Sequence, residues 1–353
     1  MPCSVPAIAP RVLTQRHLNR ALLARQLLLE RGHGSLPKTL DRIGGIQAQY
    51  APSAYVGLWS RLEGFERDQL TRALERRTVV QGTLMRVTIH LVSAASYWRY
   101  AEGIRAARRR ALLRVRKQVG GDRDFEALMK PLRKQLAGTT LSQREVRELI
   151  GEQAGFSASN WLDLVRVPPS GTWERRRADL YASAEDWLGT DGAGVGAADS
   201  VDWLVRSYLG GFGPAGRKDI ADWAGLAVRE VMASFERLEL RRFEDEQGNE
   251  LMDLPRAPLP EPDTPAPVRF IPTWDAITLA NLRRTGVLPE QYRPLLFNTK
   301  NPRSMSTFLV DGAVAGSWKF ENDRIVLDPF EKLDRQARRE LDAEAERLAE
   351  FHR

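Results

Sequence analysis

The feature that most constrains the fold is a unit of short helices followed by β-strand, which occurs three times along the chain. In the clearest case, residues 201–238 contain helical segments with apolar residues at helical spacing, separated by glycines. Residues 240–254 then predict a hairpin with Gln247-Gly248-Asn249 at its tip. Helices joined by a tight turn and followed by a hairpin are typical of a winged helix-turn-helix module, and we predict one here.

Two earlier stretches have the same plan. In the first, the pattern predicts helices over residues 14–32 and 36–49 and a third from Phe65, before a strand over residues 83–93. In the second, residues 140–150 open with hydroxyl caps and continue as a helix. A further helix over residues 161–165, a turn and a strand over residues 173–183 complete this unit.

The C-terminal part has a different pattern. Residues 254–267 hold six prolines, which is typical of an extended linker. Asp311-Gly312 between two apolar runs predicts a β-hairpin, and residues 334–351 predict an amphipathic closing helix. The expected fold is therefore α+β, with three tandem winged-helix modules and a β-barrel-like domain. The predicted domains are residues 11–100, 101–198, 199–262 and 263–353.

Composition limits the classes of function. A chain of 353 residues with 42% hydrophobic content can bury a core and form more than one domain. The only cysteine is Cys3, and the four histidines show no metal-ligand spacing, so we expect no disulfide and no metal site. No apolar run is long enough to span a membrane, and the N-terminus does not resemble a secretory signal. We therefore expect a cytoplasmic, nucleoid-associated protein.

The charge distribution allows a polyanionic partner. The formal net charge is +7, and seven basic residues fall between Arg105 and Lys117, including Arg109 and Arg110. Arg175, Arg176 and Arg177 form a second block. Either block could be a solvated helix face, or a surface that contacts DNA phosphates and loses affinity as salt rises.

Known catalytic motifs are missing, but one segment is unusual. The sequence contains neither a G-x-S-x-G elbow nor a phosphate-binding loop. Gln47 and Gln49 lie at the end of a predicted helix, next to Gly44 and Gly45. On an ideal helix the two side chains point about 200° apart, so they can share a site only if the helix ends or distorts there. The alternative is that they cap backbone groups at a helix end.

Several segments together resemble one known family, the winged-helix DNA glycosylases of the AlkZ/YcaQ type, from about Thr14 to Phe330. These segments are GIQAQYAP, LMRVTIHLVSA, GFGPAGRKDIADWAGL, PTWD and FLVDGAVAGSW. The resemblance implies three tandem winged helices followed by a β-barrel. The family's catalytic motif of glutamine, apolar residue, then glutamine or aspartate matches Gln47, Ala48 and Gln49.

The resemblance also implies a reaction. The Gln–Gln branch acts on bulky N7-alkylguanine adducts and, in some members, on interstrand crosslinks, and includes self-resistance enzymes against alkylating antibiotics. No metal or nucleotide cofactor is implied. Alkylation at N7 places a positive charge on guanine, which then leaves as a neutral base. Two amides that orient a water and face the positive charge that develops on the sugar therefore suffice as catalytic groups. We hypothesise that Gln47 and Gln49 act on one water.

Further residues are candidates for contacts to DNA. Arg86, Thr88 and His90 alternate on the predicted strand of the first unit, where they form either a solvated face or groove contacts. The remaining candidates are Arg105, Arg109, Arg110, Lys300 and Arg303. The predicted partner is duplex DNA that contains an alkylated purine, bound by a monomer.

The alternative function is a non-catalytic winged-helix DNA-binding protein or transcription regulator. Regulators of this kind usually dimerise to read paired half-sites.

Overall fold

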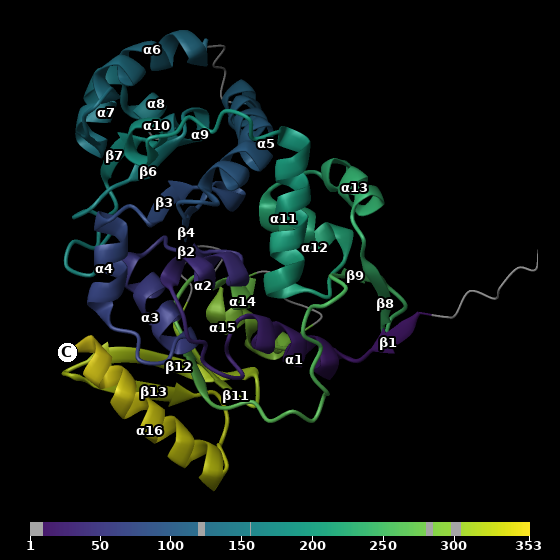
Figure 1. Cartoon of the computed structure of the whole chain (residues 1–353). Helices are drawn as coiled ribbons and strands as arrows, with labels where there is room; N and C mark the ends of the chain where they lie inside the picture. The colour runs from purple at the N-terminus through teal and green to yellow at the C-terminus, as the bar shows by residue number, and fades with distance from the viewer. Residues whose placement is uncertain (1–9, 119–123, 156, 280–284, 298–304) are drawn as a thin grey trace, which may run out of the picture.

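The computed structural model describes residues 10–118, 124–155, 157–279, 285–297 and 305–353 (Figure 1). The described strands form three sheets, and helices surround them. The largest sheet has six strands. They are β2 (Ile46–Gln47), β3 (Val79–Thr83), β4 (Ile89–Ser93), β5 (Leu141–Ser142), β6 (Leu164–Arg166) and β7 (Leu180–Ser183).

This sheet joins the first two predicted units. Its order is β2-β4-β3-β6-β7-β5, so the pairing of β3 with β6 links strands on either side of residue 100. The expected single strand over residues 83–93 is wrong, because the chain turns back within it to form the β3–β4 hairpin. The helix expected over residues 161–165 is also wrong beyond Trp161, because β6 pairs with β3 and β7 on its two sides.

Four helices are described within the first 75 residues, and the last three of them contact this sheet. They are α1 (Gln15–Arg25), α2 (Leu36–Ile43), α3 (Ala51–Arg61) and α4 (Arg67–Glu75). Helix α3 is buried on all sides, which explains why it has no amphipathic pattern to reveal it. At its end, the buried guanidinium of Arg61 forms an ion pair of 2.8 Å with Asp275, and this links α3 to the C-terminal part of the chain.

The second group of helices covers the other half of the sheet, at the top of Figure 1. The capping box predicted by the hydroxyl-rich start of residues 140–150 is present, since Ser142 and Glu145 bond reciprocally at the start of the helix. These helices are α5 (Tyr97–Gln118), α6 (Phe125–Leu136), α7 (Gln143–Ile150), α8 (Glu152–Gly155), α9 (Ala158–Trp161) and α10 (Ala184–Leu188).

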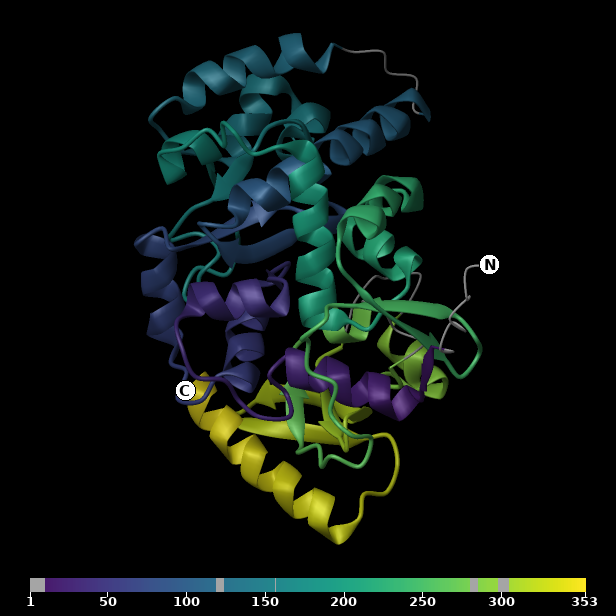
Figure 2. The same ribbon diagram turned by 45° about the vertical axis from the view of Figure 1, so that its right-hand side comes forward.

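The third group has the predicted order of three helices and a hairpin. It comprises α11 (Ala197–Phe212), α12 (Arg217–Ala224), α13 (Val228–Arg237), β8 (Arg241–Asp245) and β9 (Glu250–Asp253). Helix α11 packs against α1, α2 and α5, and Figure 2 shows it upright in the middle of the molecule. The N-terminal strand β1 (Arg11–Leu13) pairs in parallel with β8, so the start of the described chain is joined to this group.

The C-terminal sheet is open, so the predicted β-barrel is wrong. Its described strands pair in the order β10-β11-β12-β13, and the two outer strands are not bonded to each other. Helix α16 packs against the sheet and buries Leu341 and Leu348. The predicted Asp311-Gly312 turn is confirmed, with both residues at positive φ. The elements are β10 (Arg269–Ile271), α14 (Ala276–Leu279), η2 (Glu290–Tyr292), α15 (Arg293–Leu296), β11 (Thr307–Val310), β12 (Ala313–Glu321), β13 (Arg324–Pro329) and α16 (Arg335–His352).

None of the helices among the described residues is both long and apolar enough to cross a bilayer.

Candidate active site

The glutamine segment begins where α2 ends. Helix α2 stops at Ile43, and Gly44 and Gly45 both have a φ of 78°. A Cβ atom on Gly45 would lie 3.0 Å from the carbonyl oxygen of Leu91, so this position needs glycine for space as well as for conformation. The helix expected to continue to Gln49 is therefore too long, and Gln47 lies on strand β2 opposite His90 of β4.

Gln47 is buried, with 5% of its surface exposed, and its amide is held by Arg86. The Oε1 atom of Gln47 accepts a hydrogen bond of 3.0 Å from Nη2 of Arg86. Because a guanidinium only donates, the atom that faces it must be the amide oxygen. The orientation of the Gln47 amide is thus defined by its partner.

Gln49 is exposed and is anchored to the neighbouring strand. Its Oε1 atom accepts a hydrogen bond of 3.2 Å from the backbone N–H of Ile89, while the N–H of Ala48 donates to the carbonyl of Ile89 at 2.7 Å. Gln47 and Gln49 therefore both contact the segment from Arg86 to Ile89. Each amide oxygen uses one of its two lone pairs in this way.

The tip of the β3–β4 hairpin differs from the expected strand. Arg86 and Val87 lie in the 3₁₀ turn η1 (Met85–Val87) and have φ values of 52° and 59°. Thr88 follows this turn, and its hydroxyl donates to the carbonyl of Met85. The expected alternation of Arg86, Thr88 and His90 on one strand face is therefore wrong.

His90 is buried in the sheet and neutral. It is 2% exposed, and its strand β4 lies between β2 and β3. Burial, together with the charge of Arg86, lowers its pKa to about 3. Its Nδ1 atom lies 3.1 Å from the carbonyl oxygen of Thr88, to which it donates. The groove contact expected of His90 does not fit this position, since the side chain does not reach the surface.

The arginines of α5 have partners within the protein. Arg105 forms an ion pair of 2.9 Å with Asp163, and Arg109 donates to the carbonyl of Trp161 at 3.0 Å. Arg110, half exposed, forms an ion pair with Glu230. The side chains of the residues from 115 onward in α5, and the predicted DNA contacts Lys300 and Arg303, lie outside the described residues.

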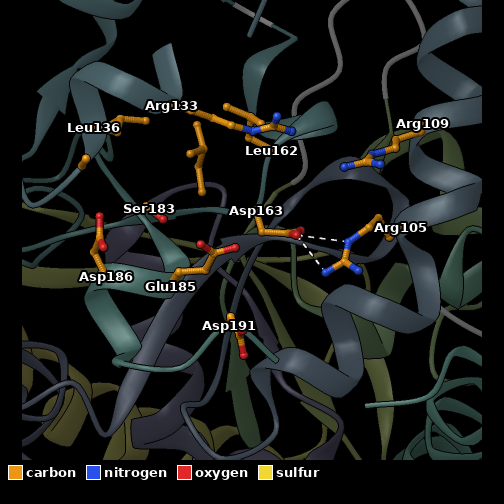
Figure 3. Close-up of a pocket in the computed structure, with 12 residues that line it drawn as sticks. Arg105, Arg109, Arg133, Leu136, Leu162, Asp163, Ser183, Glu185, Asp186 and Asp191 are labelled. Carbon is orange, nitrogen blue, oxygen red and sulfur yellow. Dashed lines mark hydrogen bonds and ion pairs between the residues drawn. The ribbon is translucent and has the colours of Figure 1, made fainter. Parts of the chain in front are cut away.

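Arg105 and Arg109 also line a cavity of about 470 Å³ between α5, α6 and α10. Figure 3 shows that Asp163, Glu185 and Asp191 project into the same space. These carboxylates disfavour a phosphate ligand. The cavity does not include the two glutamines, so it is not the candidate catalytic site.

The second arginine block lies beside Gln49. Arg175, Arg176 and Arg177 are exposed, and Nη1 of Arg176 donates at 3.1 Å to the hydroxyl of Tyr50. The loop that carries them is braced, because Gln81 of β3 donates to the carbonyl of Gly171 at 2.6 Å. The sequence indicated this block only as a charge cluster. Its position next to the glutamine segment appears only in the folded chain.

The site contains no arrangement of metal ligands. Within the described parts of the chain, no group of three or more histidine, cysteine, aspartate or glutamate residues could hold a metal ion. The polar groups beside Gln47 and Gln49 are amide, guanidinium and backbone groups.

Comparison with known proteins identifies one family and one fold. The family model described as "DNA glycosylase AlkZ-like" matches residues 40–351. The structure is similar to that of Streptomyces sahachiroi DNA glycosylase AlkZ, with a TM-score of 0.80, 17% sequence identity and 97% of each chain covered. No curated protein matches the chain. The matched residues include Gln47, Gln49 and the β3–β4 hairpin.

Proposed function

The chain belongs to the AlkZ-like DNA glycosylase family, and we therefore propose that it hydrolyses the N-glycosidic bond of cationic N7-alkylguanine in DNA. The observation that carries this proposal is the pair of amides, Gln47 and Gln49, both anchored to the β3–β4 hairpin. Both are neutral, which suffices where the base already carries a positive charge in the substrate.

The proposed reaction needs little acid–base chemistry. N7-alkylguanine departs as a neutral base, so no residue has to protonate it. Positive charge develops on the sugar, where amide oxygens can face it and hold a water by its hydrogens. Glutamine cannot remove a proton efficiently, so Gln47 and Gln49 act by orientation and electrostatics.

The proposed substrates are bulky adducts or interstrand crosslinks. The triplet Gln47-Ala48-Gln49 resembles the Gln–Gln branch of the family, to which such substrates are attributed. The exposure of Gln49 and of Tyr50, whose side chain is 42% exposed, supports this choice. A catalytic group at the surface can approach a lesion that is too large to be extruded into a closed pocket.

We propose that DNA phosphates contact the exposed block of Arg175, Arg176 and Arg177, which continues the surface from Gln49 and Tyr50. Arg110 can contribute by exchanging its half-exposed ion pair for a phosphate. Contacts by Arg105, Arg109, Lys300 and Arg303, and a monomeric state, remain predictions.

Release of free modified base tests the proposed function. Purified protein is incubated with duplexes that carry N7-methylguanine, a bulky N7 adduct or a crosslink, and mass spectrometry identifies the released bases. Spontaneous loss of base is subtracted. We expect release by the wild type, with Gln47→Ala and Gln49→Ala each reducing the rate about 10²-fold while affinity for DNA stays nearly the same.

Two outcomes would contradict the proposal. Full excision by both glutamine variants would show that Gln47 and Gln49 are not the catalytic residues. No release from any lesion, combined with sequence-specific binding to undamaged DNA, would favour a regulator.

A further inference from the structure

Arg86 connects the glutamine segment to a distant part of the chain. Its guanidinium donates through Nη2 to Oε1 of Gln47 at 3.0 Å and through Nη1 to the backbone carbonyl of Trp223 at 2.9 Å. Gln47 belongs to the edge strand β2, whereas Trp223 lies in the last turn of α12. One planar side chain therefore spans the two elements.

The α12–α13 turn packs directly on the hairpin tip. A Cβ atom on Gly225, which ends α12, would lie 3.3 Å from the backbone nitrogen of Arg86. The carbonyl of Trp223 is one of the last four of α12, which lack a partner within a helix. A cation at this end of a helix is favourable, so Arg86 both caps α12 and complements its dipole.

The backbone of the tip is strained around this contact. Arg86 and Val87 both have left-handed conformations, which are unfavourable for residues with a Cβ atom. Such conformations persist where the surroundings determine them, and they occur often at functional sites. Here the strained turn directs the guanidinium of Arg86 inward to Gln47, while the side chain of Val87 is 41% exposed.

The electrostatic surroundings of Arg86 are unusual. The side chain is half-buried, and desolvation lowers its pKa, yet it forms no ion pair with any carboxylate in the described residues. Its acceptors are two neutral oxygens. A cation in such a place costs energy that a purely structural role could avoid with a neutral side chain. Its forked donors lie in one plane and hold an amide and a carbonyl at once.

We propose that Arg86 is a positioning residue, which orients the amide of Gln47 and sets its location relative to the third helical group through Trp223. This inference rests on the proposed function. Without the fork, the Gln47 amide can rotate about its last bond and exchange oxygen for nitrogen at the reaction centre. The chemical step should then slow, while the affinity for DNA should not change.

The test separates positioning from a phosphate contact. Single-turnover excision of N7-methylguanine and the dissociation constant for undamaged duplex, at several salt concentrations, are measured for Arg86→Met and Arg86→Lys. We expect Arg86→Met to slow excision about 10- to 100-fold and Arg86→Lys to recover part of the loss, since an ammonium donates without the fork. The salt dependence of binding should not change.

A double-mutant cycle shows whether Arg86 acts through Gln47. In the Gln47→Ala background, Arg86→Met should lower the rate less than about threefold, because the group it positions is absent. If Gln47→Ala alone already lowers excision to the spontaneous rate, the cycle cannot show a further loss. The positioning role is then tested by Arg86→Lys, which should excise faster than Arg86→Met at the same affinity for DNA. Arg338→Met, which removes a charge from an exposed pair on α16, is the matched control and should have no effect.

Three results would overturn the inference. One is full excision by Arg86→Met, and another is an equal rate loss with and without Gln47. The third is a decrease of about one in the salt slope, which would make Arg86 a phosphate contact. If the wild type releases no modified base, the proposed function itself fails. If Gln47→Ala loses activity but Arg86→Met keeps full activity, the positioning role of Arg86 is wrong and the proposed function stands.

Discussion

At the scale of residues, the two glutamines of the candidate site and the nearby histidine are all uncharged. Gln47 and Gln49 carry no charge, and His90, which lies opposite Gln47 on β4, is kept neutral by its burial. Asp275 caps the start of α14, since its Oδ1 accepts from the N–H of Ile277 at 3.1 Å. The same carboxylate also pairs with Arg61, which the sequence did not indicate.

The burial of His90 predicts a loss of stability in mild acid. Its pKa of about 3 in the folded protein lies below the ordinary value of 6.5, so only the unfolded state binds a proton between these values. The free energy of unfolding should therefore fall as the pH drops through this window, by up to about 2 kcal/mol at pH 5. Urea titrations at pH 7 and pH 5 measure the difference in the free energy of unfolding. This difference should be smaller in His90→Asn, which keeps a donor for the carbonyl of Thr88. His33→Asn, at an exposed position, is the control and should leave this difference unchanged.

At the scale of elements, the junction between α2 and β2 determines where the glutamine segment lies. Two consecutive left-handed glycines turn the chain from helix to strand, and the N–H of Gly45 bonds to the carbonyl of Leu40 at 2.8 Å. The turn fits closely under β4, beside Leu91 and Val92. A helix that continued through this point would direct Gln47 and Gln49 to different sides.

Replacement of Gly45 should therefore damage both stability and activity. Gly45→Ala adds a Cβ atom 3.0 Å from a backbone oxygen at a φ of 78°, and we expect a loss of about 2 kcal/mol or more and slower excision. Gly64→Ala is the matched control, because Gly64 also has positive φ but open space around it. It should lose only about 1 kcal/mol and keep full excision. Equal effects of the two variants would show that the fit under β4 is unimportant.

At the scale of the whole molecule, buried ion pairs tie together parts that are distant in sequence. Arg25 pairs with Asp253 at 2.7 Å with both side chains fully buried, and Arg61 pairs with Asp275 at 2.8 Å. The exposed block of Arg175, Arg176 and Arg177 lies near Gln49 through the contact of Arg176 with Tyr50. The shared six-stranded sheet makes this possible, because it holds the second unit beside the first.

The arginine block predicts the salt dependence of DNA binding. Replacement of Arg175, Arg176 and Arg177 by glutamine should weaken binding and reduce the slope of log K against log salt by about 0.9 for each phosphate that the variant no longer neutralises. Fluorescence anisotropy between 50 and 200 mM salt, roughly the range over which such interactions weaken, measures this slope. Arg338→Gln on α16 serves as the control. An unchanged slope in the triple variant would show that these three arginines do not contact DNA phosphates.

Local patterns in the sequence determined much of the secondary structure. Helical periodicity, caps and turn residues act within a few positions, so α7, the helices α11–α13, the turn at Asp311-Gly312 and helix α16 could be predicted. The Gln47-x-Gln49 motif was visible for the same reason. The helix α3 was missed because a helix buried on every side has no polar face.

Only the tertiary structure decided which groups meet these glutamines. Arg86 and Trp223 are 137 residues apart, and Arg176 and Tyr50 are 126 residues apart. The open C-terminal sheet and the sheet shared by two units likewise depend on pairing between distant strands. Such contacts leave no periodic signal in a single sequence, because they depend on how whole elements pack. The local sequence therefore determined where the two glutamines occur in the chain, and the tertiary structure determined that Arg86 and the backbone of Ile89 bind their amides.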